Sequence, residues 1–183
     1  MISALGDFYQ GRFSKSLFHG IGRHIKYRGD DYSGEFCRAK RHGWGKLKRV
    51  FGETYEGDFV DDFFEGKGKL VEGKITYEGS FLKGKKHGKG VQIWSNGIKY
   101  EGDWINDEIE GEGEMSWGKS KVYKGSFKGW KREGKGMYIY QDYHFGYRYD
   151  GDWVNDQEQG KGVKEIFGIG TYTGDFNQGK MHG

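Results

Sequence analysis

The sequence contains no proline, a single cysteine and no long apolar run, and each absence excludes a class of protein. A collagen-like chain requires proline beside its glycine, and this chain has none. Cys37 is the only cysteine, so neither an intramolecular disulfide nor a multi-cysteine zinc site can form, which favours a reducing compartment. No stretch reaches the 18 apolar residues of a membrane helix, and Met1 to Leu5 is too short for a signal-peptide core. We therefore expect a soluble, cytoplasmic protein.

Charge and composition predict a folded protein and do not indicate a nucleic-acid partner. The 30 basic and 27 acidic residues leave a formal net charge of +3, which is too balanced to indicate a nucleic-acid partner. Aromatic residues make up 17% of the chain, whereas disordered chains contain few. Together with 35 glycines, this composition predicts many short strands packed by aromatic rings.

One pattern explains both the glycines and the aromatics. The motif Tyr-x-Gly-x-Phe/Trp occurs eight times, with spacings of 23, 23, 22, 23, 23, 26 and 23 residues. A glycine follows each tyrosine after 11 residues, and in the first seven copies a second glycine follows two residues later, giving Gly-x-Gly. The repeats begin at Tyr9, Tyr32, Tyr55, Tyr77, Tyr100, Tyr123, Tyr149 and Tyr172.

This pattern resembles the MORN (membrane occupation and recognition nexus) repeat family, as in YEGSFLKGKKHGKGV from Tyr77 and YEGDWINDEIEGEGEM from Tyr100. The resemblance runs from about Tyr9 to Gly183. It implies an all-β fold in which about eight antiparallel hairpins stack into an elongated single-layer sheet, with residues 1–183 forming one repeat array. The last repeat is incomplete because it ends at its first glycine, Gly183, which is typical of a fragment of a longer array.

The alternation of residues predicts a register for each hairpin. Tyr, Gly and Phe/Trp at two-residue intervals share one strand face. In the third repeat, this spacing predicts that rings lie across bare glycines of the partner strand, through the pairs Phe59–Gly66, Gly57–Gly68 and Tyr55–Leu70.

The same register predicts a solvated face of opposite charges, where each cross-strand pair contributes roughly 0.2–1 kcal/mol. A one-layer sheet of this kind is expected to have no deep interior, and eight hairpins would extend roughly 70–75 Å at about 4.8 Å per strand. The fifth repeat is an exception with like charges opposed, Asp103 to Glu112 and Glu101 to Glu114, beside Lys121 and Lys124. Elsewhere the predicted pairs are Asp58–Lys67, Glu56–Lys69 and Asp152–Lys161.

The stretch GEGEMSWGKS, Gly111 to Ser120, matches the Walker A pattern from Gly113 to Ser120. A phosphate-binding loop must open a helix, because the helix N-terminus and backbone N–H groups bind the phosphate. Gly113 is instead a repeat glycine, and a strand is expected around Tyr123. We predict that no nucleotide or other cofactor binds.

The histidines and carboxylates do not form a catalytic or metal-binding pattern. His19, His42, His87 and His182 all precede a repeat glycine, so they form one row of hairpin ends. Neighbouring hairpins are roughly 10 Å apart, whereas shared ligands lie near 2 Å from a zinc ion. We therefore expect no metal site and, without a Ser/His/Asp or Cys/His group, no enzyme.

Two surfaces could bind partners. Extra aromatic residues surround the 26-residue interval, and we expect them to gather at one point as a protein-binding cluster, unless the longer loop folds its rings back onto the sheet. The cluster comprises Trp130, Tyr138, Tyr140, Tyr143, Phe145 and Tyr147. The second candidate is a regular aromatic groove formed by Tyr55, Tyr77, Tyr100 and their neighbours.

Anionic phospholipid is the alternative partner, since the resemblance extends to proteins that associate with such lipids and basic loops bind phosphates. The hairpin ends, however, alternate in charge: Arg38, Lys40 and Arg41 are followed by Asp61, Asp62 and Glu65, and Lys83, Lys85 and Lys86 by Asp107, Glu108 and Glu110. Alternation favours ion pairing between neighbouring ends and interrupts a cationic stripe.

These features predict a non-catalytic scaffold that binds a helix or extended segment of another protein within a larger complex. The resemblance makes a cytoskeletal or ciliary (axonemal) assembly the expected location. The alternatives are a phospholipid-associated tether at the cytosolic face of a membrane, and the targeting portion of a larger enzyme that continues past Gly183.

Overall fold

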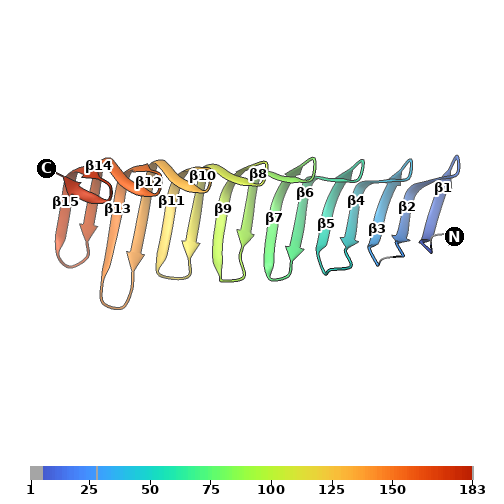
Figure 1. Ribbon diagram of the computed structural model, residues 1–183, viewed down its shortest axis with the longest axis horizontal. Coiled ribbons are helices and arrows are strands. Elements are labelled where there is room, and N and C mark those ends of the chain that lie inside the picture. The colour runs from blue at the N-terminus through green and yellow to red at the C-terminus, as the bar shows by residue number, and fades with distance from the viewer. Residues whose placement is uncertain (1–5, 28, 183) are drawn as a thin grey trace. The chain divides into compact units, whose positions relative to one another are not determined.

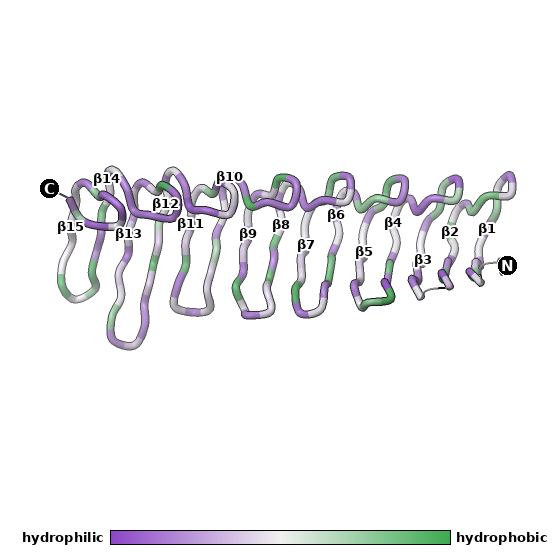
Figure 2. Tube along the Cα trace, in the orientation of Figure 1, coloured by the Kyte–Doolittle hydropathy of each residue, from purple (hydrophilic) through white to green (hydrophobic). Residues whose placement is uncertain are grey.

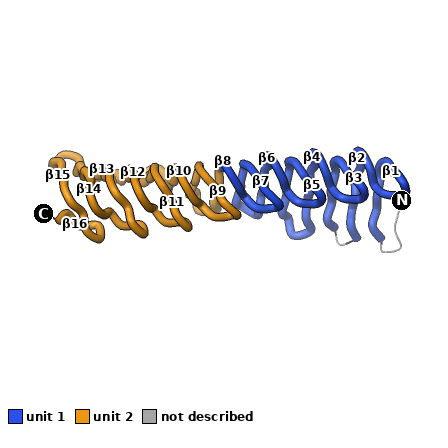
Figure 3. Tube along the Cα trace, turned by 90° about the horizontal axis from the view of Figure 1, so that it is seen from above, with its two compact units in different colours: residues 1–90 blue, residues 91–183 orange. Residues whose placement is uncertain are grey.

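The structure, a computed structural model, describes residues 6–27 and 29–182, and it is all-β (Figure 1). Sixteen strands pair in chain order, β1 to β16, in one open antiparallel sheet. The chain divides into two compact units, Met1–Gly90 (unit 1) and Val91–Gly183 (unit 2), shown in Figure 3. The terminal glycine Gly183 and the segment Met1 to Leu5 lie outside the described residues.

Two consecutive strands form the hairpin of each repeat. The first four hairpins are β1 (Phe8–Ser14) with β2 (Leu17–Ile25), β3 (Asp31–Cys37) with β4 (Lys40–Lys48), β5 (Thr54–Val60) with β6 (Phe63–Glu72), and β7 (Ile75–Leu82) with β8 (Lys85–Ile93). The others are β9 (Ile98–Ile105) with β10 (Glu108–Trp117), β11 (Lys121–Lys128) with β12 (Lys131–Gln141), β13 (Gly146–Val154) with β14 (Gln157–Ile166), and β15 (Gly170–Asn177) with β16 (Lys180–His182).

The two strands of a repeat are joined by a two-residue turn, which we call the tip. In the third hairpin Asp61 and Asp62 form the tip with φ values of 48° and 77°. Positive φ at both residues is the requirement of the type I′ turn, whose twist matches that of antiparallel strands. Longer loops, such as the one between β4 and β5, join successive repeats.

The expected register holds for only half of each hairpin. Gly57 pairs with Gly68 and Tyr55 with Leu70, which confirms two of the predicted pairs. The predicted Phe59–Gly66 pair is wrong, because Phe59 lies opposite Phe64. The β6 strand takes up two extra residues in a bulge, where its glycine has a φ of 59°, in the left-handed region that favours glycine.

This bulge bends the hairpin and folds its tip over the aromatic face. Four residues of straight strand span about 13 Å, yet the ring centroids of Tyr55 and Phe59 are 5.0 Å apart. Phe64, beyond the bulge, stacks on Tyr55 at 3.7 Å. The expectation of no deep interior is therefore wrong, since each hairpin encloses rings between its strands and its folded tip.

The core recurs with the repeat. Hydrophobic residues recur along every hairpin instead of gathering in one segment (Figure 2). The largest side chains with almost no exposed surface are Trp104, Tyr55, Tyr77, Tyr100, Tyr123, Tyr149, Phe59 and Ile109.

The charged face follows the same corrected register. The Glu56–Lys69 pairing is confirmed, but Asp58 lies opposite Glu65 instead of Lys67. Asp152 likewise lies opposite Gln159 instead of Lys161, because the bulge comes before it. Several ion pairs instead join one hairpin to the next, including Lys46–Glu56 at 3.0 Å, Lys135–Asp152 at 2.5 Å and Lys161–Asp175 at 2.7 Å.

The fifth hairpin keeps one of its two predicted like-charge pairs. Glu101 lies opposite Glu114, and Lys124 of the next hairpin lies on the other side of Glu114. Asp103 does not face the side chain of Glu112; beyond the bulge, its carboxylate accepts the backbone N–H of Glu112 at 3.0 Å. Lys121, expected to neutralise these carboxylates, instead lies 5.6 Å from the centre of the Tyr140 ring.

Candidate functional site

The repeat tyrosines, predicted to line an open groove, are part of the core. Tyr55 and Tyr77 are 1% exposed and Tyr100 is 0% exposed, so a partner cannot reach them while the tips are folded. A Cβ atom on Gly68 would lie 2.3 Å from the Tyr55 hydroxyl, which shows how closely the ring covers the glycine pair. Burial is the main cause that raises the pKa of Tyr55 and Tyr100 above the ordinary value.

In five hairpins the residue nine positions after the repeat tyrosine lies over its ring, and the chemistry of that residue changes from hairpin to hairpin. Phe18 stacks on Tyr9 at 3.7 Å, as Phe64 does on Tyr55. In other hairpins a cation occupies this place: Arg41, Lys86 and Arg132 lie 5.9, 5.2 and 5.7 Å from the centres of their tyrosine rings.

Cations at the start of the strand after one tip are paired with the tip of the next hairpin. Arg41 contacts Asp62 at 2.9 Å and Lys40 contacts Asp61 at 3.6 Å. Arg132 binds Asp156 of the following hairpin in the same way, at 3.1 Å. The predicted ion pairing between successive hairpin ends is therefore present, and these cations are partly neutralised within the fold.

The residue before the first Gly-x-Gly glycine links hairpins through a different bond. Glu65 accepts the backbone N–H of Lys83 at 2.9 Å, and Glu110 accepts that of Gly129 at 2.9 Å. His42 occupies the equivalent position, and its Nδ1 lies 3.9 Å from Asp61. No group of three metal-ligating side chains occurs within the described part of the chain.

The Walker A match lies on strand and turn. Gly113 is in β10, Gly118 has a φ of 69° in the loop after that strand, and β11 begins at Lys121. The segment after Ser120 is thus a strand where a phosphate-binding loop requires a helix.

The 26-residue interval lengthens the hairpin-like connection between β12 and β13. Tyr140 lies opposite Tyr147 on these strands, and the loop between them is held by Asp142, whose carboxylate accepts the N–H of Phe145 at 2.8 Å. The rings of Tyr140, Phe145 and Tyr147 lie 6.0–6.3 Å from one another. Tyr143 is 98% exposed and Phe145 46% exposed, so this end of the connection presents rings to solvent.

The six predicted rings do not gather at one point. Trp130 is in the tip between β11 and β12, at the other end of β12 from Tyr140. It packs against Trp94 at 6.1 Å and Trp104 at 5.8 Å. The reason is the bend, which the repeat spacing does not reveal: it folds this tip toward the preceding hairpin.

Tyr138 and Tyr147 are only half-buried members of the cluster. Tyr138 packs against Trp153 at 6.1 Å, and Lys164 lies 4.4 Å from the centre of the Tyr147 ring. Lys164 also forms an ion pair with the buried Glu158 at 2.9 Å. Burial is the main cause that raises the pKa of Tyr147 to about 12. We call Tyr140, Tyr143, Phe145 and Tyr147 the exposed aromatic cluster; Tyr143 and Phe145 are its exposed members, and Tyr140 and Tyr147 are half-buried.

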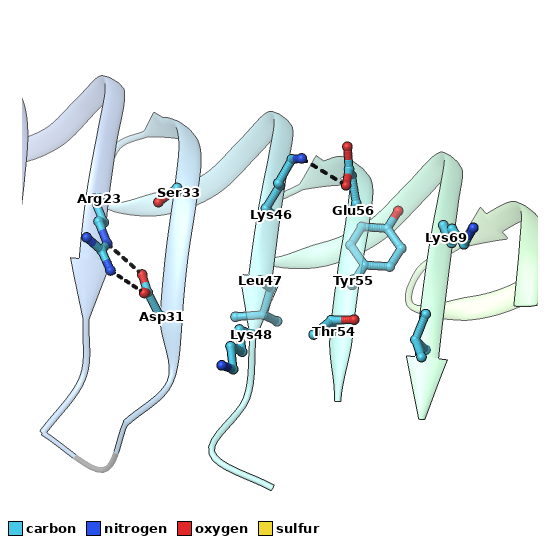
Figure 4. A pocket seen from close by; sticks show the side chains of 11 residues that line it. Arg23, Asp31, Ser33, Lys46, Leu47, Lys48, Thr54, Tyr55, Glu56 and Lys69 are labelled. Carbon is cyan, nitrogen blue, oxygen red and sulfur yellow. Dashed lines mark hydrogen bonds and ion pairs between the residues drawn. The ribbon is translucent and has the colours of Figure 1, made fainter. Parts of the chain in front are cut away.

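Two surfaces of unit 1 were not predicted from the sequence. The loops before β3 and β5 expose Tyr27 (79%), Val50 (53%) and Phe51 (98%), beside Lys48 and Arg49. The second surface is a groove of about 610 Å³ on the charged face, which is lined by residues of β2 to β6 (Figure 4). The signal for the groove was present as a basic residue directly after Gly-x-Gly in each of the first three repeats.

Comparison with protein families identifies the same repeat. The MORN repeat matches residues 9–30, 55–71, 77–99, 100–121, 123–145, 149–165 and 172–183. The hairpin of β3 and β4 falls between matched segments, yet Tyr32 covers Gly45 just as Tyr55 covers Gly68. No curated protein matches the chain. Within the described residues, no helix has the length and apolar character needed to cross a membrane.

Proposed function

The chain belongs to the MORN repeat family, and from this premise we propose that it is a non-catalytic scaffold that binds other proteins in a cytoskeletal or ciliary (axonemal) assembly. Repeats of this family suggest an interaction or membrane-associated module. The cytoplasmic and ciliary location rests on the resemblance to arrays found in ciliary components.

The exposed aromatic cluster supports protein binding. Interruptions of a strict repeat period are where an array gains a binding feature, and this cluster lies at the only interval of 26 residues. Tyrosine and phenylalanine rings offer large contact area at small entropic cost, and such residues dominate binding hot spots. Tyr143 extends fully into solvent, where burial by a partner gains the most area.

The test uses single substitutions in the full chain. Tyr143→Ala and Phe145→Ala should each weaken retention of co-purifying proteins, because truncation of a hot-spot residue costs at least about 2 kcal/mol of binding free energy. Phe51→Ala is the matched control, since Phe51 is equally exposed but lies in a loop of unit 1. An unchanged melting temperature must accompany each measurement.

Equal retention of every partner by wild type, Tyr143→Ala and Phe145→Ala would exclude the cluster as the binding site.

The proposed location has its own test. A tagged full-length chain should sediment with the detergent-resistant cytoskeletal fraction. A fully detergent-soluble chain in ciliated cells would contradict the assembly that we propose.

Association with anionic phospholipid is the second candidate, and the loops of unit 1 favour it. Phe51, Val50 and Tyr27 lie in loops, and Arg49 in the second of these loops and Lys48 at the end of β4 are close in sequence to Phe51. Apolar residues that enter the headgroup region beside cations form the general pattern of an interfacial lipid contact. Phe51→Ala should then reduce sedimentation with phosphatidylserine vesicles while Tyr143→Ala leaves it unchanged, and equal sedimentation of both variants with wild type would exclude this contact.

A further inference from the structure

Three consecutive hairpins of unit 1 place a cation at the same position. Arg23, Lys46 and Lys69 each follow their repeat tyrosine by 14 residues and lie on β2, β4 and β6. We call these three residues the cation row. In the next four repeats the same position holds Val91, Glu114, Met137 and Val163.

The cation row remains accessible despite its internal ion pairs. Arg23 contacts Asp31 at 2.6 Å, with its side chain 52% exposed. Lys46 contacts Glu56 and Lys69 contacts Glu78, at 3.0 and 3.5 Å, with lysine side chains 58% and 54% exposed. Exposed ion pairs typically contribute about 0–1 kcal/mol. Since an ammonium group has three donors, each lysine retains donors for a second carboxylate.

The row lines the groove on the charged face of unit 1 (Figure 4). Lys48 adds a fourth cation, so cations among the lining residues outnumber the two carboxylates, Asp31 and Glu56. The hydroxyl groups of Ser33 and Thr54 also line the groove and can donate hydrogen bonds. Its volume of about 610 Å³ and its excess of cations favour an anionic occupant.

The spacing of the row distinguishes among anionic occupants. Cations on every second strand repeat at about 9.6 Å, because neighbouring strands lie about 4.8 Å apart. A peptide in polyproline II conformation has three residues per turn and rises about 3.1 Å per residue, so every third side chain lies on the same side and advances about 9.3 Å. A helix matches less well, since seven residues advance about 10.5 Å.

We propose that this groove binds an acidic segment of a partner protein in extended polyproline II conformation, with a carboxylate at every third residue facing the cation row. This inference rests on the proposed scaffold function, because the occupant is a protein. In this proposal the partner's acidic residues contact unit 1, and the exposed aromatic cluster of unit 2 is a separate contact.

Fluorescence anisotropy with the full chain tests the proposal. One labelled peptide carries glutamate at every third position, separated by serine and threonine, and a second peptide of equal composition has its glutamates adjacent. The periodic peptide should bind at least about tenfold more tightly, since its charges match the row. Lys46→Glu should weaken its binding at least about tenfold, whereas Lys83→Glu, which alters a tip outside the groove, should leave it unchanged.

Three outcomes would overturn the proposal: equal affinity for the two peptides, equal losses in Lys46→Glu and Lys83→Glu, or displacement of the peptide by phosphatidylserine vesicles. Circular dichroism melting shows whether both variants remain folded. If Lys46→Glu is not folded, Lys46→Gln is the milder substitution to test. If the peptide fails to bind while Tyr143→Ala still loses protein partners, the groove assignment alone is wrong. If wild type retains no partner either, the scaffold function fails as well.

Discussion

Every repeat begins with tyrosine rather than phenylalanine because its hydroxyl group is used. The Tyr55 hydroxyl donates to the carbonyl of Asp58 at 2.9 Å, across the glycine pair that the ring covers. The same bond to the residue three positions later is made by Tyr9, Tyr32, Tyr77, Tyr100, Tyr123, Tyr149 and Tyr172. The ring thus fills the space above two glycines while its polar end satisfies a backbone carbonyl inside the bend.

Tyr55→Phe should therefore destabilise the protein although it keeps the ring. Loss of the hydroxyl leaves the Asp58 carbonyl without this donor, and a buried unsatisfied group costs about 1–3 kcal/mol. Urea unfolding measures the difference in the free energy of unfolding. Tyr143→Phe serves as the control, because its fully exposed side chain should change that free energy by less than about 0.5 kcal/mol. Equal stability of the two variants would argue against a role for the hydroxyl.

The glycines beneath the rings should tolerate no side chain. A Cβ on Gly68 would meet the Tyr55 ring at 2.3–2.6 Å, so Gly68→Val must displace that ring. Overpacking of this kind costs about 1–3 kcal/mol, whereas Lys85→Ala at an exposed position should stay within roughly 0.5 kcal/mol. Thermal unfolding compares the two, and similar shifts in melting temperature would refute the packing of Tyr55 over this glycine.

At the scale of the hairpin, the bulge decides which charges meet. The fifth hairpin is the informative case, since Glu101 and Glu114 remain opposite each other while Lys124 of the next hairpin flanks Glu114. Lys99 also contacts Glu101 at 2.8 Å. Each of the two carboxylates thus has a cation nearby, Lys99 on the same strand as Glu101 and Lys124 opposite Glu114, and the sheet tolerates a like-charge pair that would otherwise be unfavourable.

Lys124→Glu should consequently destabilise the protein more than Lys83→Glu does. The first change places a third carboxylate beside Glu101 and Glu114, at roughly 0.2–1 kcal/mol for each cross-strand contact. The second alters one exposed tip. Urea unfolding at low ionic strength and at 1 M salt separates the contributions, because the screening length falls to about 3 Å at 1 M. A difference that persists unchanged at 1 M salt would exclude an electrostatic origin.

At the scale of the whole molecule, the buried tyrosines couple stability to alkaline pH. Burial is the main cause that raises the pKa of Tyr32, Tyr55, Tyr100 and Tyr123. It raises the pKa of Tyr147 and Tyr149 to about 12. Since the unfolded value is about 10, the folded state holds these protons more tightly, and the resulting stabilisation is complete below pH 10.

The free energy of unfolding should thus be level from about pH 8 to 9.5 and fall as pH rises from about 10 toward 12. Urea unfolding at a series of pH values measures this dependence. Tyr149→Phe should fall less steeply than wild type, because it removes one titrating group. A free energy that stays constant up to pH 11.5 in wild type would contradict the burial of these hydroxyl groups.

The sequence alone determined the repeat, the strand content and the family. Tyrosine, glycine and aromatic residues at alternate positions fix one face of a strand, and eight copies in phase predict eight hairpins. The pairs Gly57–Gly68 and Glu56–Lys69 followed from that alternation because they precede the bulge. The ion pairs of Lys40 and Arg41 with Asp61 and Asp62 also followed from sequence, since a basic hairpin end is followed there by an acidic one.

Only the tertiary structure decided what is buried and which rings meet. The bulge has no signature beyond a glycine, whose positive φ is visible only in the folded backbone. The bend turns the repeat tyrosines from a surface into a core and carries Trp130 away from Tyr140 and Phe145. Alternation along a strand specifies a face, but burial of that face depends on what folds over it. The sequence therefore predicted the hairpins, and their bending fixed which side chains remain exposed to bind.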